Sequence, residues 1–211
     1  MLDRLGEFLI VGGPVVWVLL LMSIAAVSII VLKLWQFVTL KPEYQGNLEE
    51  VFSLWRRGEN QTALERLDET VFIANVAGFA MQSLNEGAWD EEVLKEELDR
   101  IAILKLNDLR SLLPALETIG TLSPLLGLLG TVLGMINAFQ AMEAAGTQVD
   151  PSVLSGGIWQ ALITTALGLG VAIPALIAHS WMVQKLQRVA TQFNDCVTQL
   201  FTSYHFENRP K

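Results

Sequence analysis

The clearest pattern in the sequence is three long apolar stretches that are nearly free of ionisable side chains. They cover residues 8–32, 118–142 and 151–184, and His179 is the one ionisable residue inside them. A helix needs about 20 predominantly apolar residues to cross the hydrocarbon core of a bilayer. One such stretch fits a buried helix of a soluble protein, but three in one short chain predict an all-α integral membrane protein with three transmembrane helices.

The three spans are predicted at residues 11–38, 116–142 and 155–181. The remaining segments are an N-terminus at 1–10, a polar helical region at 39–115, a loop at 143–154, and a C-terminal helix and tail at 182–211. We interpret the first stretch as a retained span. It is longer than the apolar core of a signal peptide, and no small-residue cleavage site precedes Lys33.

Apolar residues recur at helical spacings within the polar region. The first such face contains Leu48, Val51, Phe52, Leu54 and Trp55. A turn is predicted at Gly58, and residues 85–88 are predicted to end a later helix, because glycine and asparagine interrupt the apolar pattern there. The polar region is therefore expected to contain several short helices.

A long helix is predicted to begin at Asp90, because acidic residues in a first turn favour a helix start. Its mixed amphipathic face contains Val93, Leu94, Leu98, Ile101, Leu104 or Lys105, Asp108 and Leu112. The apolar content then rises without a break, so this helix is predicted to continue into the second span. Pro114 and Pro124 are expected to bend it rather than end it, since neighbouring helices can satisfy the carbonyls that a proline frees in a membrane. The third span is likewise predicted to extend beyond residue 182 as an amphipathic helix.

The positions of lysine and arginine predict the orientation of the chain in the membrane. The loop between the second and third spans has neither residue. The flanks of the first and third spans contain Lys33, Lys41, Lys185, Arg188, Arg209 and Lys211. The positive-inside rule therefore places the polar region and the C-terminus in the cytoplasm, with the N-terminus and the second loop outside.

Composition and charge narrow the class of protein further. The chain is 52% hydrophobic and 17% charged, with a formal net charge of −8. An acidic chain is a poor partner for nucleic acid. The sequence has no glycine-rich phosphate loop, metal-ligand motif or nucleophile elbow, while His179 and His205 are isolated and Cys196 resembles a small packed hydrophobe. We therefore expect no enzyme activity, no cofactor and no metal site.

Small and polar residues follow one stripe on each of the second and third spans. The stripe on the second span contains Gly127, Gly130, Thr131 and Gly134. The stripe on the third span contains Gln160, Thr164, Gly168 and Ala172, with Thr165 beside it. Small residues let membrane helices approach closely, so the glycines are predicted to be packing positions. The threonines fit packing and a polar path equally well, because a threonine hydroxyl can also bond to a carbonyl of its own helix.

No span carries an ionisable residue near its middle, although proton paths in bilayers usually require one. Two alternatives follow: either the chain carries no protons, or a partner protein supplies the titrating group. In the second case Thr131, Thr164, Thr165 and Gln160 are the candidate residues that would hydrogen-bond a partner's carboxylate.

Two long motifs resemble a known family. The motif Leu116-Glu-Thr-Ile-Gly-Thr-Leu-Ser-Pro124-Leu-Leu-Gly-Leu-Leu-Gly-Thr131-Val-Leu-Gly-Met is similar to the second-span signature of the ExbB/TolQ/MotA proton-channel family. The motif Gly157-Ile-Trp-Gln-Ala-Leu-Ile-Thr-Thr165-Ala-Leu-Gly-Leu-Gly-Val-Ala-Ile-Pro174-Ala-Leu resembles its third-span signature. Three spans are typical of ExbB and TolQ rather than MotA, which has four.

The resemblance implies a multi-pass protein of the bacterial inner membrane that forms a homopentamer in the lipid bilayer. The ring would enclose a single-span protein of the ExbD or TolR type, whose aspartate carries the proton. The resulting motion would act on a periplasm-spanning protein of the TonB or TolA type. Thr131 and Thr165 match the threonines that line the ring in this family, and Pro174 matches its third-span proline.

Gln160 departs from the family pattern, which commonly has glutamate in the corresponding Gly-Ile-x-Glu-Ala-Leu motif. Glutamine forms hydrogen bonds but does not titrate, so the resemblance implies more reliance on the partner's aspartate. The local motif favours an ExbB-like subunit that energises outer-membrane import through TonB. The alternatives are a TolQ-like subunit of the Tol-Pal envelope system and a membrane scaffold that conducts nothing.

Overall fold

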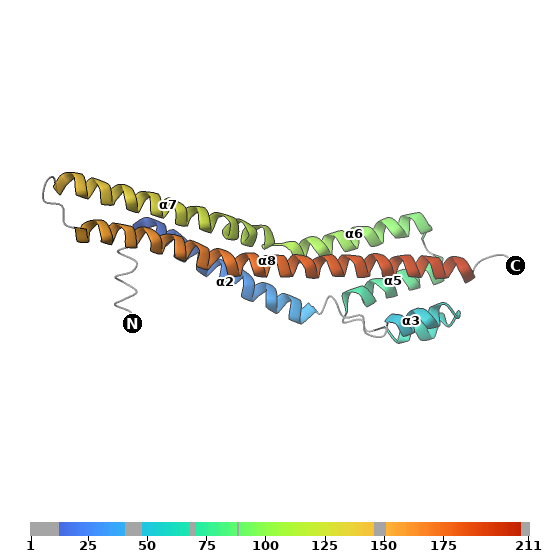
Figure 1. Ribbon diagram of the computed structural model, residues 1–211. Coiled ribbons are helices and arrows are strands. Elements are labelled where there is room, and N and C mark those ends of the chain that lie inside the picture. The colour runs from blue at the N-terminus through green and yellow to red at the C-terminus, as the bar shows by residue number, and fades with distance from the viewer. Residues whose placement is uncertain (1–12, 41–47, 68–70, 88, 146–150, 208–211) are drawn as a thin grey trace. The chain divides into compact units, whose positions relative to one another are not determined.

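The computed structural model describes residues 13–40, 48–67, 71–87, 89–145 and 151–207 of the chain (Figure 1). Every secondary-structure element in these residues is a helix. The helices are α2 (Gly13–Leu40), α3 (Leu48–Trp55), α4 (Asn60–Glu65), α5 (Phe72–Glu86), α6 (Glu91–Arg110), α7 (Leu113–Ala145) and α8 (Pro151–Glu207).

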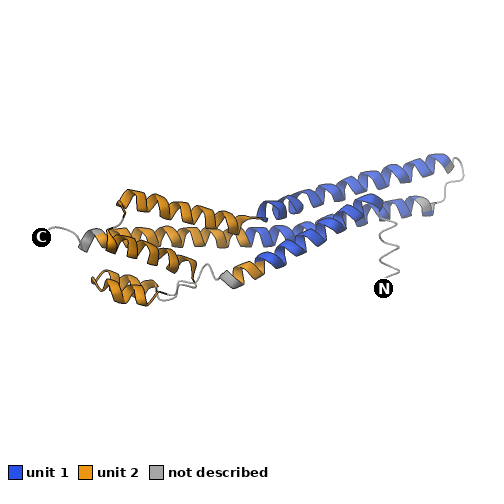
Figure 2. Cartoon of the chain, turned by 180° about the vertical axis from the view of Figure 1, so that it is seen from behind, with its two compact units in different colours: residues 1–33, 112–181 blue, residues 34–111, 182–211 orange. Residues whose placement is uncertain are grey.

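The chain forms two compact units, which Figure 2 colours separately. Unit 1 contains residues 1–33 and 112–181, and unit 2 contains residues 34–111 and 182–211. Because α2 and α8 run through the boundaries, each contributes residues to both units.

Unit 1 exposes large apolar side chains along its helices. Leu21 on α2 is 66% exposed and Ile177 on α8 is 65% exposed. A soluble protein seldom leaves apolar surface of this extent uncovered. Three helices are long and apolar enough to cross a bilayer, within Gly13–Val38, Glu91–Ala144 and Leu154–Tyr204. The predicted all-α membrane protein with three transmembrane helices is confirmed.

The helix that was predicted to run unbroken from Asp90 into the second span is interrupted at Ser111 and Leu112. The backbone N–H of Ser111 donates to the carbonyls of Asn107 and Asp108, which closes the last turn of α6. Leu112 then adopts a left-handed φ of 65°. The prediction of one continuous helix is therefore wrong.

Pro114 explains the position of this break. Within a continuous helix, its ring would clash with the carbonyl four residues earlier, that of Arg110. In the observed structure Pro114 lies in the first turn of α7, where its missing N–H has no consequence. Pro124 and Pro174, by contrast, lie inside α7 and α8.

Helices α7 and α8 both reach into the range 143–154 that was predicted as a loop. Residues 143–145 complete α7 and residues 151–154 begin α8. Within this range, residues 146–150 lie outside the described residues. The same is true of residues 1–12, which include the predicted N-terminus and the start of the first span, and of the tail at 208–211. The helices therefore extend beyond the lengths that the apolar stretches predicted.

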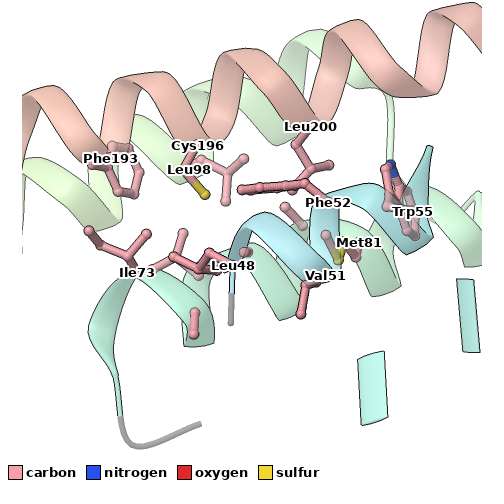
Figure 3. Close-up of a cluster of buried hydrophobic side chains, with 14 of the residues drawn as sticks. Leu48, Val51, Phe52, Trp55, Ile73, Met81, Leu98, Phe193, Cys196 and Leu200 are labelled. Atoms are coloured by element: carbon pink, nitrogen blue, oxygen red, sulfur yellow. The ribbon is translucent and has the colours of Figure 1, made fainter. Parts of the chain in front are cut away.

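Unit 2 has a hydrophobic core between α3, α5, α6 and the C-terminal half of α8 (Figure 3). The members labelled in Figure 3 are Leu48, Val51, Phe52, Trp55, Ile73, Met81, Leu98, Phe193, Cys196 and Leu200. This confirms the predicted apolar face of α3 and the amphipathic helix that follows the third span. On α6 the buried face differs from the prediction, because Val93 and Leu104 are exposed while Ala102 and Leu109 are buried.

The helices of unit 2 begin and end at residues with clear local causes. Asp90 caps α6, and its carboxylate accepts a hydrogen bond from the backbone N–H of Glu92 at 3.2 Å. Gly87 ends α5 in a left-handed conformation with φ 61°, which glycine adopts without a steric penalty. Both ends agree with the sequence predictions.

Candidate functional site

α7 and α8 approach each other at their backbones within unit 1. A Cβ atom added to Gly168 would lie 2.5 Å from the backbone oxygen of Ser123, and one added to Gly127 would lie 2.9 Å from the backbone oxygen of Thr164. Side chains larger than hydrogen do not fit at such distances. These two glycines therefore occupy positions where the helix backbones meet.

Further close approaches follow the pair of helices in both directions. A Cβ atom added to Gly130 would lie 2.6 Å from the Thr164 side chain, and one added to Gly134 would lie 3.1 Å from Ala161. The close approaches extend from Gly120, where an added Cβ would lie 2.7 Å from Leu176, to Gly157, where it would lie 2.4 Å from Ala138. Since residue numbers rise on one helix as they fall on the other, the two helices are antiparallel.

Two threonine hydroxyls of α8 donate to one carbonyl of α7. Thr164 is 1% exposed, and its hydroxyl donates to the carbonyl of Ala161 at 2.7 Å and to that of Gly127 at 3.3 Å. The hydroxyl of Thr165 donates to the same Gly127 carbonyl at 3.2 Å. These bonds fix the two helices in one register.

Thr131 and Gln160 are half-buried near the same contact. The hydroxyl of Thr131 donates to the carbonyl of Leu128 in its own helix at 2.6 Å. Gln160 lies one turn from Thr164 along α8. The structure thus brings Thr164 and Thr165 of α8 against Gly127 of α7, and all three threonine hydroxyls donate to backbone carbonyls.

Sequence reasoning missed several members of this contact. Ser123 is fully buried, and its hydroxyl donates to the carbonyl of Ile119 at 2.6 Å. A contact between Glu117 and His179, with 3.8 Å between Oε2 and Nε2, was also missed. Ser123 lies four residues before Gly127 on the same side of the helix, which could have indicated it, whereas no local pattern indicates a contact between Glu117 and His179.

Among the described residues, no group of three or more histidine, cysteine, aspartate or glutamate side chains is placed to hold a metal ion. Cys196 is buried in unit 2, and burial raises the pKa of its thiol to about 12, with the neighbouring Asp195 carboxylate adding to the effect. A thiol in this state is a poor nucleophile and a poor metal ligand.

The fold and the contact define a class of protein: a membrane protein with three spans, two of which pack through glycines and carry hydroxyls but no central charge. Residues 64–195 match the MotA/TolQ/ExbB proton channel family. The chain therefore belongs to this family, which is one of channels and transport proteins rather than enzymes.

Individual relatives carry both ExbB and TolQ names. A putative biopolymer transport protein ExbB homolog from Methanothermobacter thermautotrophicus is 33% identical over 61% of this chain and 45% of its own length. The Tol-Pal system protein TolQ of Haemophilus influenzae is 29% identical over 65% of this chain and 61% of its own length. The putative biopolymer transport protein ExbB-like 3 of Synechocystis is 31% identical over 79% of each chain. The chain thus spans about half the length of the first two relatives.

Proposed function

We propose that the chain is the multi-span subunit of a proton-driven motor. Five copies form a ring that encloses an ExbD- or TolR-like single-span partner, and protons cross on a carboxylate that the partner supplies. The work acts on a TonB-like periplasm-spanning protein and energises outer-membrane import. The observation that carries this proposal is the pairing of α7 and α8, which presents threonines but no ionisable residue at its centre.

The physical argument is one of cost. An unpaired charge in the middle of a bilayer is expensive, so an ionisable residue there is kept where function requires it. This chain avoids such a residue in all three spans, yet it belongs to a family of proton channels. A titrating group on a partner reconciles the two facts, and Thr131, Thr165 and Gln160 are the residues that would meet it.

The proposal includes a location and an orientation. The chain lies in the bacterial inner membrane, with its N-terminus in the periplasm and unit 2 in the cytoplasm. The support is the lysine and arginine content of the short flanks, against none in residues 143–154.

Native mass spectrometry of the detergent-purified chain, co-expressed with its single-span partner, tests the assembly. We expect a pentamer that retains fewer than five copies of the partner. A monomer or dimer that ignores the partner contradicts the motor and favours the scaffold alternative.

Proton flux into proteoliposomes tests the role of the threonines. The double variant Thr131→Val with Thr165→Val keeps the shape of both side chains but removes both hydroxyls, so it should assemble normally and lose most of the flux. The double variant Thr131→Ser with Thr165→Ser retains the hydroxyls and is the matched control, which should conduct. A scaffold would instead tolerate both double variants in cells.

A TolQ-like role in the Tol-Pal system is the second candidate, because the TolQ protein of Haemophilus influenzae is among the relatives. Complementation separates the two roles. Restored growth on an iron–siderophore complex in cells lacking ExbB supports the TonB role, whereas restored outer-membrane integrity in cells lacking TolQ supports the alternative.

A further inference from the structure

An acidic and an imidazole side chain meet between α7 and α8 in unit 1. Nε2 of His179 lies 3.8 Å from Oε2 of Glu117, and the two side chains are 18% and 58% exposed. The separation exceeds the roughly 3.2 Å limit of a good N–H···O hydrogen bond, so the contact is loose as it stands. It is close enough for a strong attraction once the imidazole carries a proton.

These two groups are unusual for the span pair in which they lie. In the described part of unit 1, the ionisable side chains are Lys33 on α2, Glu117 and Glu143 on α7, and His179 on α8. Lys33 is buried, and Glu143 lies at the opposite end of α7 from the pair. The next charged residue along α8 is Lys185, in unit 2. An ionisable group within a span is a functional candidate by default.

The pair also lies in line with the threonines of the proposed path. Glu117, Pro124 and Thr131 are seven residues apart on α7, and seven residues make about two helical turns. The same spacing joins Thr165, Ala172 and His179 on α8. Each member of the pair is therefore on nearly the same side of its helix as a threonine, about 21 Å further along the axis.

We propose that Glu117 and His179 form a proton-accepting pair at the cytoplasmic end of the path, through which protons leave the channel. The inference rests on the proposed function and extends it. It names two residues of this chain that exchange protons with water, in addition to the carboxylate that the partner supplies.

One proton enters and one leaves in each cycle. The neutral imidazole of His179 accepts at Nε2 a proton that arrives along the path as hydronium, which leaves a water molecule, and becomes imidazolium, whose charge the Glu117 carboxylate balances. The hydrogen on Nε2 then passes to Oε2 of Glu117. The more exposed carboxyl group releases it to the solvent, which restores the neutral imidazole and the carboxylate.

Proton flux through proteoliposomes that contain the complex tests the pair. Glu117→Gln and His179→Gln should each lower the flux by about tenfold or more, as expected when an acid–base group is removed. Glu143→Gln removes a carboxylate from the other end of α7 and should conduct normally.

A variant in which the two residues exchange places tests whether the loss of flux has a purely structural cause. Glu117→His combined with His179→Glu retains one carboxylate and one imidazole, so it should regain flux relative to either single variant. Native mass spectrometry confirms that each variant assembles.

The outcomes separate this inference from the proposed function. If the unmodified complex does not conduct, the proposed function fails. If it conducts and both glutamine variants conduct equally well, the proton-accepting pair is wrong and the channel stands. An equal loss of flux in Glu143→Gln, or a swapped pair that assembles without regaining flux, also overturns the pair.

Discussion

At the scale of single residues, the glycines of α7 and α8 differ sharply in what surrounds them. Gly168 meets the backbone of Ser123, whereas an added Cβ at Gly170 would have no heavy atom within 4 Å. Both glycines lie in α8, two residues apart. Of the two, only Gly168 was predicted from the sequence to be a packing position, because it follows the stripe of small and polar residues on the third span.

Gly168→Ala should therefore lower the free energy of unfolding by about 1–3 kcal/mol, because the new methyl group overpacks the helix contact. Gly170→Ala is the matched control and should be neutral or stabilising by about 0.5–1 kcal/mol, since alanine is the better helix former. Thermal unfolding of the detergent-solubilised protein measures both. Equal losses in the two variants would mean that helix propensity, rather than the contact, sets the cost.

Cys196 should react slowly with thiol reagents. Its pKa of about 12 is above the ordinary value of 9.0, so the reactive thiolate is scarcer at neutral pH, by roughly a thousandfold. Because the folded state holds the proton more tightly, the thiol also makes folding stability decrease as the pH rises above about 9.

Maleimide labelling at pH 8 checks this prediction. Cys196 should label quickly only after denaturation, whereas a cysteine introduced at the exposed Asn194, as Asn194→Cys, should label at once. Labelling of Cys196 in the folded protein at the rate of the exposed thiol would contradict its burial.

At the scale of elements, the break between α6 and α7 places a leucine in a backbone conformation that suits glycine. Leu112 has φ 65° and is 47% exposed, so its side chain contributes little burial in return for the strain. A left-handed residue with a Cβ costs about 1–2 kcal/mol.

Leu112→Gly should therefore stabilise the protein by up to about 1 kcal/mol, after allowance for the greater flexibility of glycine in the unfolded chain. Leu104→Gly, at a residue 56% exposed within α6, should destabilise it by about 1 kcal/mol. Opposite signs in thermal unfolding support the observed break. A loss in both variants would indicate a continuous helix through Leu112.

Much of the element pattern was predictable from the sequence, and the exceptions have physical causes. Ionisable-free stretches indicated three spans, and the acidic residues at Asp90 indicated a helix start that the structure confirms. The break at Leu112 was missed because the apolar content of a stretch gives no information about the clash between Pro114 and the preceding turn. The Glu117–His179 contact was missed because it joins residues 62 positions apart, which no local pattern reveals.

At the scale of the whole molecule, the two units differ in what covers their apolar residues. Unit 2 encloses its own core, whereas unit 1 leaves large apolar side chains exposed on all three of its helices. This difference fits a soluble region attached to a membrane region, and the proposed orientation assigns the soluble region to the cytoplasm.

Labelling with a maleimide that does not cross membranes tests that orientation in cells with a permeabilised outer membrane. Glu143→Cys should label from the outside, and Asn194→Cys should label only after the inner membrane is opened. The reverse labelling pattern would mean that the topology of the chain is opposite to the one proposed. Because Cys196 is expected to react slowly with maleimide, it should contribute little background labelling.

The hydrogen bonds of the two half-buried threonines also determine what they can offer to another molecule. A hydroxyl has one hydrogen and two lone pairs, and Thr131 and Thr165 each donate that hydrogen to a backbone carbonyl. Only lone pairs remain. A neutral carboxylic acid can approach them with its own hydrogen, while an ionised carboxylate meets oxygen with oxygen and is repelled. The hydroxyls therefore discriminate between the two charge states of a carboxyl group, in favour of the one that carries the proton.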